Sequence, residues 1–547
     1  MTVETRSEVS QAAPAGAGQE GPPVTTPDDI SVARATGVIA LGNIASRLVG
    51  LARETLLSDL FGAGAAVDAF NVAIIVPRTL FDLLIGGHVS SAIVPVLSEH
   101  AMQQDRSALW ELVNLLLGVV TVVLALLVLV LEVFAPQVVA LVSSAASEET
   151  LSLAAALLRV TTPALLFLSL FAVLSGLLYA LRRFALPAFA GALFNGSIVV
   201  VALVLAPRLG IAAMAVGWLT GAVVQCASQL ISLRDARLRP TLRGAWQHPG
   251  LRRITVLYVP VMFSLVIDTL VIRLVSYNLA SHAGEASISY MNYATTLIQF
   301  PHGLVATAIS IAILPTLSRQ ALLLAAEGVS TYRSTLGRGL RLAIVLIIPA
   351  TVGLFVLATP IIDLIFEHGT FTAVDTAITS LALKLYLFGL PFAAIDLLLV
   401  FAFYSQQDTL TPALIGMISL GAYMVVALGL LPRYGLFSLM IADSIKHLLH
   451  AGISARFLSR RIGGLRGLGL PLTTLKTGAA ALAMGFVAAL CLRFIEEIVS
   501  TETLVGEIVQ VAGAGSVGAL LFLGLAVLFR IDEFTWLFGL LRQRLGR

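Results

Sequence analysis

Long apolar runs divide the sequence along almost its whole length, and this pattern constrains the fold more than any other feature. About fourteen runs reach the roughly 20 residues that an α-helix needs to cross a bilayer. Charged residues make up only 12% of the chain, about half the share in a typical soluble domain. We therefore predict an all-α integral membrane protein with about fourteen transmembrane helices. The predicted spans are 33–52, 66–97, 107–134, 150–181, 184–206, 209–233, 254–281, 287–317, 338–366, 376–404, 409–431, 435–458, 473–495 and 505–530.

The charges between these runs alternate along the chain. Arginines gather in one set of loops, such as 182–183, 234–253 and 456–476, whereas the other set carries acidic residues such as Glu148 and Glu149. Basic loops tend to stay on the cytoplasmic side of a membrane, so we expect both termini to be cytoplasmic. Residues 1–32 lack the basic and apolar pattern of a signal peptide. Their composition predicts a disordered cytoplasmic tail.

Two pairs of segments indicate an internal repeat. Tyr179 precedes Pro187 by the same spacing as Tyr404 precedes Pro412, and segment 92–98 resembles 312–318. The members of each pair lie about six predicted helices apart, which gives them the same orientation in the membrane. We predict two six-helix lobes in parallel repeat plus two C-terminal helices. The predicted parts are a tail (1–32), an N-lobe (33–233), a cytoplasmic linker (234–253), a C-lobe (254–458) and a final segment with two helices and a basic C-terminus (459–547).

Sequence signatures of enzymes and of ATP-driven pumps are missing. The chain has no GxxxxGK[ST] phosphate loop, no HExxH zinc motif and no GxSxG nucleophile elbow. Cys226 and Cys491 lie in apolar runs without ligand-spaced partners, so we expect neither a disulfide nor a metal site. The net charge of +3 gives no reason to expect nucleic-acid binding. We expect a transporter without a cofactor, apart from a coupling ion whose identity stays open.

The first two runs carry charged residues within or beside their apolar stretches. These residues include Arg47, Arg53, Glu54, Arg78 and Asp82. A charge in a bilayer is costly unless it faces a partner or a water-filled cavity. Arg47 stands in the middle of its run among apolar neighbours, so we predict that it lines a cavity.

Several motifs together resemble the MurJ/MviN family of lipid II flippases. They are SRLVGLARE at 46–54, FGAGAAVDAF at 61–70, IVPVLSE at 93–99, LPTLS at 314–318, GTFTA at 369–373 and FYSQQDTLTP at 403–412. The resemblance implies the fold of the multidrug/oligosaccharidyl-lipid/polysaccharide exporter superfamily. It also implies movement of lipid II, an undecaprenyl-pyrophosphate-linked peptidoglycan precursor, across the bacterial cytoplasmic membrane. The implied cycle is alternating access, driven by an ion gradient or by the membrane potential.

The resemblance further implies a set of substrate-binding residues. Arg47, preceded by Ser46, matches a cavity arginine in the first helix, and Arg53 matches the second arginine of the same motif. Asp68 matches an aspartate at the start of the second helix, where it would pair with Arg53 or respond to ions. Arg273 resembles an arginine of the seventh helix. The full predicted set is Ser46, Arg47, Arg53, Asp68, Arg78 and Arg273.

The chain departs from the family pattern where many members carry charged residues. Phe81 and Asp82 stand in place of an arginine pair, and Thr296 stands in place of an arginine in the eighth helix. Gly86 occupies a position that is acidic in many members. Arg78 lies one turn before Asp82 on the same helix face, where it would replace part of the lost positive charge.

Other polar residues within the apolar runs have simpler expected roles. We expect His88 and His302 to be structural or interfacial. Lys384 would extend to the membrane interface or pair with Asp396 or Asp363.

Two other functions fit the same sequence. The lost arginine positions would suit an exporter of another polyprenyl-linked glycan or of a small cation. The chain would otherwise be a membrane scaffold in cell-wall synthesis that transports nothing. The expected partners are a lipid II-like substrate, membrane lipids and proteins of cell-wall synthesis.

Overall fold

The computed structural model describes residues 27–84, 96–99, 101, 107–234, 236, 238–244, 247–252, 272–322, 329–499 and 503–534. The regular secondary structure of these residues is entirely helical, as predicted. The N-lobe contains α1 (Pro27–Phe61), α2 (Ala65–Leu84), α4 (Ser107–Val133), α5 (Ala135–Val142), α6 (Glu148–Thr161), α7 (Ala164–Ala180), α8 (Ala185–Leu209) and α9 (Ala212–Ile231). The C-lobe contains α11 (Ile272–His282), α12 (Ser287–Pro301), the π-helix η3 (His302–Thr307), α13 (Ala308–Leu322), α15 (Val329–Val356), α16 (Ala358–Phe366), α17 (Ala373–Leu387), α18 (Leu390–Ser405), α19 (Leu410–Tyr434) and α20 (Phe437–Arg461). The helices α21 (Leu470–Ile498) and α22 (Leu504–Leu528) follow.

Nine helical stretches in the described part are long and apolar enough to cross a membrane, and the bent pair α17–α18 would make a tenth. The pair α6–α7 forms one such stretch, as does the series α12–η3–α13. Residues 85–95 of the predicted span 66–97, and residues 254–271 of the predicted span 254–281, lie outside the described residues. The count of about fourteen transmembrane helices therefore stays a prediction.

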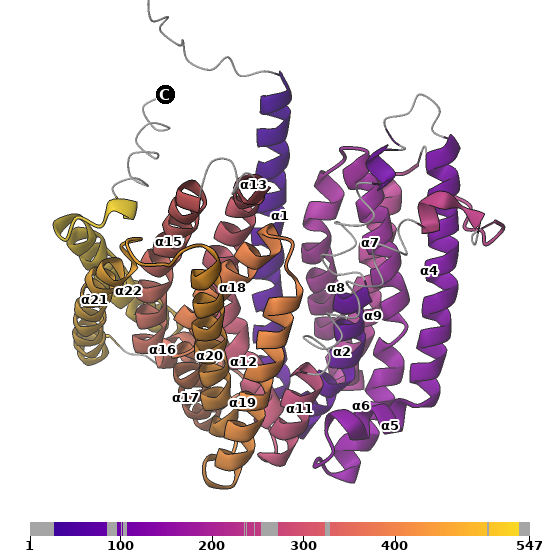
Figure 1. The fold of residues 1–547 in the computed structure, drawn as a ribbon. Helices are drawn as coiled ribbons and strands as arrows, with labels where there is room; N and C mark the ends of the chain where they lie inside the picture. Colours follow the sequence, from indigo (N-terminus) through magenta and orange to yellow (C-terminus); the bar gives the residue numbers. More distant parts are fainter. Residues whose placement is uncertain are drawn as a thin grey trace, which may run out of the picture.

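The helices form two bundles that lie side by side (Figure 1). Helix α1 stands between the bundles and packs along α8, while α21 packs on α15 at the outer edge of the C-lobe. Helix α1 begins at the same end of the molecule at which α22 ends. An even number of crossings produces this arrangement. Which side of the membrane this end faces stays a prediction.

The backbone geometry repeats between the two lobes. Arg182 and Gln407, which precede α8 and α19, have positive φ angles of 57° and 60°. The same two helices end at Gly210 and Gly435, whose φ angles are 56° and 51°. The two residues of each pair are separated by the same number of positions, which also separates the prolines of the predicted repeat. The internal repeat in the sequence is therefore also a repeat of structure.

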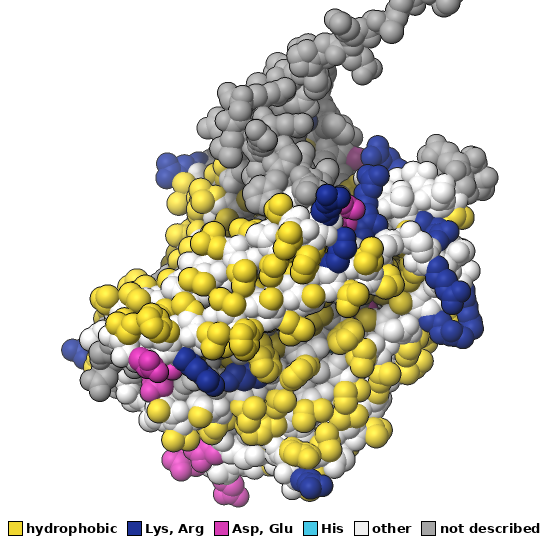
Figure 2. Space-filling view, turned by 90° about the vertical axis from the view of Figure 1, so that its left-hand side faces the viewer, with side chains coloured by type: hydrophobic (Ala, Val, Ile, Leu, Met, Phe, Trp, Pro, Cys, Tyr) yellow, Lys and Arg dark blue, Asp and Glu magenta, His cyan; other side chains and the backbone are white. Residues whose placement is uncertain are grey.

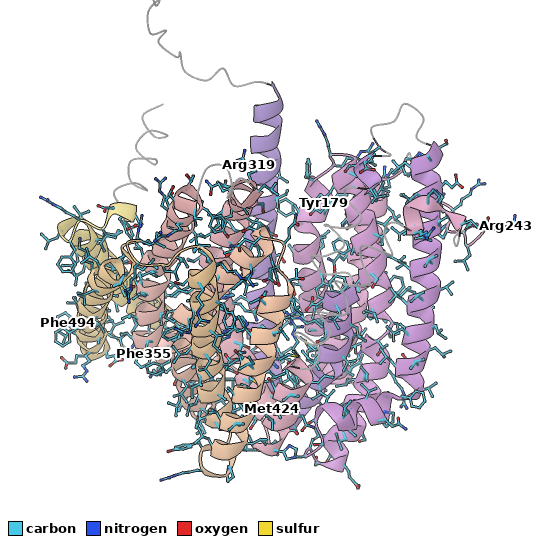
Figure 3. The ribbon with its side chains drawn as sticks, viewed as in Figure 1. Tyr179, Arg243, Arg319, Phe355, Met424 and Phe494 are labelled. Carbon is cyan, nitrogen blue, oxygen red and sulfur yellow. The ribbon has the colours of Figure 1, made fainter. Side chains whose placement is uncertain are left out.

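The outer surface of α21 and α22 is apolar. Leu482, Phe486 and Leu520 are 68%, 67% and 69% exposed, and Figure 2 shows hydrophobic side chains over most of this side of the molecule. On a protein in water, a continuous apolar surface of this kind marks an interaction surface. On this chain, with its apolar membrane-length helices, the surface is suited to contact with lipid. Arg319 lies at the end of the molecule where α1 begins (Figure 3).

The two lobes are joined at the opposite end of the molecule, which carries the acidic loops. The hydroxyl of Tyr293 in α12 donates a hydrogen bond of 2.8 Å to the carbonyl of Gly62. The backbone N–H of Thr370 donates one of 2.9 Å to the carbonyl of Asp59. Tyr293 also packs against Phe366, with ring centres 5.0 Å apart. These contacts connect the turn after α1 to the C-lobe and close this end.

Candidate functional site

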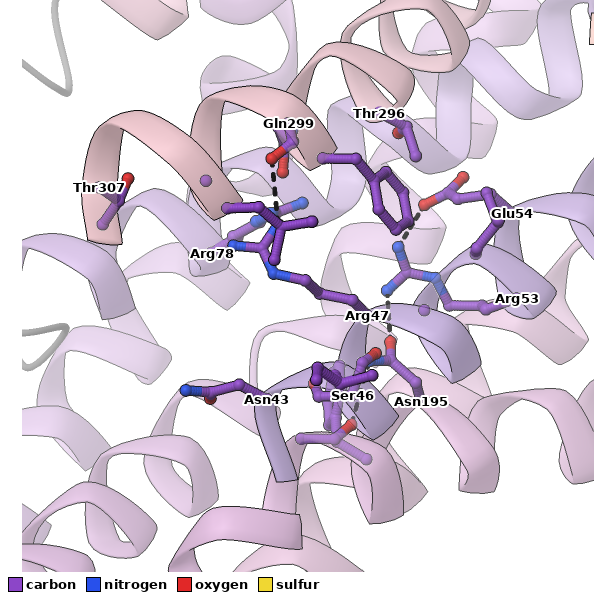
Figure 4. Close-up of a pocket in the computed structure, with 18 of the residues that line it drawn as sticks. Asn43, Ser46, Arg47, Arg53, Glu54, Arg78, Asn195, Thr296, Gln299 and Thr307 are labelled. Atoms are coloured by element: carbon purple, nitrogen blue, oxygen red, sulfur yellow. Dashed lines mark hydrogen bonds and ion pairs between the residues drawn. The ribbon is translucent and has the colours of Figure 1, made fainter. Parts of the chain in front are cut away.

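A cavity of about 770 Å³ lies between the two lobes. Helices α1, α2, α7, α8 and α9 line it from the N-lobe, and α12, η3 and α13 line it from the C-lobe. Figure 4 shows polar side chains from both lobes converging on it. Its lining includes Ser46, Arg47, Arg53 and Arg78 of the predicted set, together with Phe81, Asp82 and Thr296.

Arg47 extends from α1 to the C-lobe. Its Nη1 donates a hydrogen bond of 3.0 Å to the backbone carbonyl of Gln299 (Figure 4). This carbonyl lies just before Pro301 and η3, where the chain departs from regular α-helical hydrogen bonding. Gly303 leaves room for the guanidinium, because a Cβ at that position would overlap it. The structure thus places Arg47 in a cavity, and its binding of substrate stays a prediction.

Arg53 is held by residues of the N-lobe. Its Nη1 donates a hydrogen bond of 3.0 Å to Oδ1 of Asn195, and its guanidinium pairs with Glu54. The guanidinium carbon lies 5.9 Å from the ring centre of Trp218, which is within the range of a cation–π interaction. Three contacts therefore fix the orientation of Arg53 at the cavity wall.

Asp68 lies at the closed end of the molecule rather than in the cavity. Its Oδ1 accepts hydrogen bonds from the backbone N–H of Ser289 at 2.8 Å and from the Ser289 hydroxyl at 2.5 Å. Ser289 is in the first turn of α12, where unpaired N–H groups favour a carboxylate. The suggested pair between Asp68 and Arg53 is wrong, because each side chain has other partners. Asp68 instead caps a helix of the opposite lobe.

Asp82 and Arg273 form an ion pair between the lobes. Nη1 of Arg273 in α11 lies 2.7 Å from Oδ2 of Asp82 and 3.4 Å from Oγ1 of Thr79 in α2. Arg78, one turn before Asp82, is exposed to the cavity. Asp82 therefore removes one positive charge relative to the family pattern and also neutralises Arg273.

Ser46 lies where α1 packs closely against α8. Helix α1 places Gly42, Ser46 and Gly50 four residues apart on this face. A Cβ on Gly191 would overlap Oγ of Ser46, and a Cβ on Gly42 would overlap the backbone of Ala188. Small residues at this spacing let two membrane helices approach closely. Ser46 thus has a packing role at the edge of the cavity, and its predicted binding of substrate stays untested.

Sequence reasoning missed several amide side chains of the cavity. Asn195 accepts the bond from Arg53, and its Nδ2 donates to the Ser46 carbonyl at 3.4 Å. Gln225 and Gln299 also line the cavity. An amide within an apolar run is a usable signal, because a polar group without a partner is costly in lipid.

The remaining predicted positions lie elsewhere. Gly86 and His88 are outside the described residues. Nζ of Lys384 donates to Oγ1 of Thr359 at 3.3 Å, so the suggested pairs of Lys384 with carboxylates are wrong. Among the described residues, His, Cys, Asp and Glu form no group of three that could hold a metal ion.

The cavity carries an excess of positive charge. Arg47, Arg53 and Arg78 line it together with two carboxylates, and Arg273 pairs with one of these carboxylates. In the described part of the chain, no carboxylate lies within ion-pair distance of Arg47 or Arg78. Guanidinium groups bind phosphate oxygens through forked, charge-assisted hydrogen bonds. The arrangement therefore suits an anionic ligand with several phosphate oxygens.

Comparison with known sequences gives a consistent result. The family model described as "Lipid II flippase MurJ" matches residues 57–511. A lipid II flippase MurJ of Burkholderia cenocepacia is 34% identical over 391 residues, which cover 70% of this chain and 74% of that protein. A probable lipid II flippase MurJ of Haemophilus influenzae is 30% identical over 429 residues, covering 76% and 84%.

Solved structures share the fold. A structure described as "Lipid II flippase MurJ, inward closed conformation" matches with a TM-score of 0.73 at 24% identity, covering 90% of this chain and 99% of that one. An inward-facing multidrug transporter of the MATE family matches with a TM-score of 0.62 at 16% identity, covering 77% and 95%. Both show that this chain shares the fold of these proteins.

Proposed function

Because the chain belongs to the lipid II flippase MurJ family, we propose that it moves lipid II across the bacterial inner membrane by alternating access. Family membership and the apolar helices make it a multi-pass membrane transporter. The observation that carries the assignment of the site is the arginine-lined cavity between the lobes. Its guanidinium groups match the pyrophosphate of a polyprenyl-linked precursor in charge and in hydrogen-bond geometry.

Arg47 and Arg78 are the groups that we expect to hold the pyrophosphate. Both line the cavity, and in the described part of the chain neither meets a carboxylate at ion-pair distance. Arg47 donates a hydrogen bond to a backbone carbonyl, a neutral acceptor that a phosphate oxygen would replace with a stronger, charge-assisted bond. Arg53 and Arg273 are already paired with carboxylates, so they shape the wall and contribute less binding energy.

The cavity takes the charged part of the lipid and leaves the rest outside. Its volume of about 770 Å³ lies within the range of small-molecule pockets. We expect the polyprenyl chain to stay in the bilayer, since apolar surface gains nothing by leaving hydrocarbon. The acidic end is closed by interlobe hydrogen bonds, so a head group would enter from the other end and leave once those bonds break.

A complementation experiment tests this function. Cells depleted of their own lipid II flippase receive the wild-type chain, Arg47→Ala, Arg47→Lys or the control Arg208→Ala, which removes an exposed arginine at the end of α8. We expect rescue by the wild type and the control, loss with Arg47→Ala, and partial rescue with Arg47→Lys, which keeps charge without the fork.

Two outcomes contradict the proposal. Failure of the wild type at normal membrane expression would exclude lipid II as the cargo, and binding of other pyrophosphate lipids would then identify the substitute. Full rescue by Arg47→Ala and Arg273→Ala would favour a scaffold over a transporter.

A further inference from the structure

The C-lobe contains a second group of ionisable residues, away from the cavity. Nδ1 of His450 in α20 lies 2.5 Å from Oδ1 of Asp396 in α18. Both side chains are only 14% exposed, and neither belongs to the cavity lining. Ionisable residues inside a transmembrane bundle are costly, so their presence points to a function.

Helix α20 extends this group along one face. Lys446 and His447 follow Asp443 by three and four residues, and His450 follows them by four and three, so the four side chains share one helix face. Nζ of Lys446 bonds to Oδ1 of Asp443 at 2.5 Å, and Nε2 of His447 lies 3.6 Å from Oδ2 of the same carboxylate. Tyr423 of α19 covers Lys446, with its ring centre 5.8 Å from Nζ. The group therefore continues for two turns through the C-lobe.

The π-helix η3 connects this group to the cavity. Gly303 of η3 lines the cavity, while η3 also packs on α18. His302 is the first residue of η3, and the guanidinium of Arg47 lies against the next residue, Gly303. A change of charge on Asp396 therefore acts on the turn that faces the arginine spanning the cavity. π-helical turns occur frequently at functional sites.

The group is one positive charge short of neutrality. Asp396 and Asp443 are matched by a single ammonium, Lys446, and the histidines gain charge only on protonation. Net charge on largely buried side chains is costly, so one added proton removes an unfavourable charge. A metal cation would meet repulsion from Lys446, whereas a proton fits between Oδ1 and Nδ1. The other ionisable groups that face the cluster are His302 of η3, Tyr423 of α19 and Tyr386 of α17. Arg47 lies in the cavity, where its guanidinium meets Gly303 of η3.

We propose that the Asp396–His450 pair binds one proton and that this proton is the coupling ion of transport. The inference rests on the proposed function and names the ion that drives it. The proton binds from the water on one side, is shared between the carboxylate and the imidazole, and leaves to the other side, so only O–H and N–H bonds change. An inward movement of the proton would accompany outward movement of the cargo.

A vesicle experiment tests the coupling. The full-length chain is reconstituted with lipid II, and potassium with valinomycin holds the membrane potential at zero. If one proton is exchanged per lipid II, each unit of pH difference shifts the steady-state ratio of lipid II between the leaflets by up to about tenfold. We expect this shift in the wild type, in Asp396→Glu and in the control Asp408→Asn. We expect it to disappear in Asp396→Asn and His450→Gln.

Several outcomes would overturn the proposal. They are a wild type that flips lipid II without response to the pH difference, a shift retained in Asp396→Asn or His450→Gln, and a shift that follows a sodium gradient at constant pH. Thermal unfolding of every variant shows whether it is folded, and His450→Gln keeps the test decisive if Asp396→Asn does not fold.

A second measurement separates this inference from the proposed function. If the wild type flips no lipid II, the function fails, and proton binding is measured directly by nuclear magnetic resonance on protein with isotope-labelled histidines. The chain has 8 histidines, and His450→Gln identifies the signal of His450. A His450 signal that titrates, and whose midpoint moves in Asp396→Asn, supports the proton site. A signal that does not titrate or does not move overturns it.

Discussion

The arginines of the cavity differ in how firmly their neighbours hold them. Arg53 is bonded to Asn195 and paired with Glu54, whereas Arg47 donates to a backbone carbonyl and, among the described residues, pairs with no carboxylate. A guanidinium that already has a carboxylate must lose it, or share it, before it binds a phosphate group. We therefore expect Arg47 and Arg78, which have no carboxylate partner among the described residues, to contribute more to phosphate binding than Arg53.

Asp82 tunes the positive charge of the cavity, and removing it should strengthen binding. Asp82→Asn frees Arg273 and adds one unit of positive charge near the expected phosphate site. At about 4 Å in water a unit charge contributes about 1 kcal/mol, so lipid II should bind about fivefold more tightly. Titration at low and high salt measures this, because the gain should shrink as salt screens it. Affinity that is unchanged at low salt would contradict the prediction.

Asp408 should make the stability of the C-lobe depend on pH. Burial raises the pKa of its carboxyl, but hydrogen bonds from Thr411 and Arg461 outweigh burial and hold the pKa below its ordinary value. A pKa lowered by folding stabilises the fold above the unfolded-state pKa of about 3.9, and this stabilisation is lost as the pH falls through the folded-state pKa. Asp408→Asn should lower Tm at pH 7 and approach the wild type as the pH falls below about 4.

Thermal unfolding of the detergent-solubilised protein between neutral and acidic pH measures this difference. Thr411→Val, which removes one hydroxyl donor to Asp408, should show the same pH dependence with a smaller effect. A difference in Tm that stays constant with pH would contradict the role assigned to the carboxylate charge.

The sequence predicts single charges in the cavity better than it predicts pairs. Arg47 is recognisable because a charge within an apolar run needs a cavity or a partner. The pairing of Asp82 with Arg273 joins positions 191 residues apart, and no local pattern connects them. For the same reason the sequence suggests Arg53 as a partner of Asp68, whereas the carboxylate of Asp68 caps α12 in the other lobe.

The close packing of α1 on α8 makes Gly42 sensitive to substitution. A Cβ at Gly42 would overlap the backbone of Ala188, and backbone cannot rotate away as a side chain can. Gly42→Ala should therefore push the helices apart and destabilise the protein by about 1–3 kcal/mol. Gly429→Ala in α19 is the matched control, because nothing lies within 4 Å of its added Cβ.

Thermal unfolding of the two alanine variants tests the packing. The control should match or slightly exceed the wild type, since alanine favours a helix over glycine. Equal stability of Gly42→Ala and Gly429→Ala would show that α1 and α8 can separate without cost.

Apolar runs locate helices, but they do not define their ends or breaks. The run 33–52 lies inside the longer helix α1 (Pro27–Phe61), because polar end turns extend beyond the hydrocarbon and have no hydropathy signal. The run 150–181 is broken between α6 and α7 near Pro163. The run 287–317 contains the π-helix η3 after Pro301, a break that hydropathy does not reveal.

At the scale of the whole molecule, the internal repeat can be predicted from the sequence, but the position of the cavity between the lobes cannot. The spacing that relates the two lobes is visible in the sequence and in the positive φ angles of Arg182 and Gln407. The position of the cavity depends on which end of the bundle pair is closed. That is decided by hydrogen bonds between segments far apart in the sequence, such as the one from Thr370 to Asp59 at the end of α1.

Alternating access requires the acidic ends of the lobes to separate, so a covalent bond between them should stop transport. Asp59 and Thr370 are suitable positions, because the backbone N–H of Thr370 lies 2.9 Å from the Asp59 carbonyl. In a background with Cys226 and Cys491 replaced by serine, oxidation of Asp59→Cys with Thr370→Cys should join the lobes. Flipping of lipid II in vesicles should then fall to background and recover on reduction, because opening needs several interlobe bonds to break together. Each single-cysteine variant should be indifferent to the oxidant. A fully cross-linked protein that still flips lipid II would show that the closed end does not open during transport.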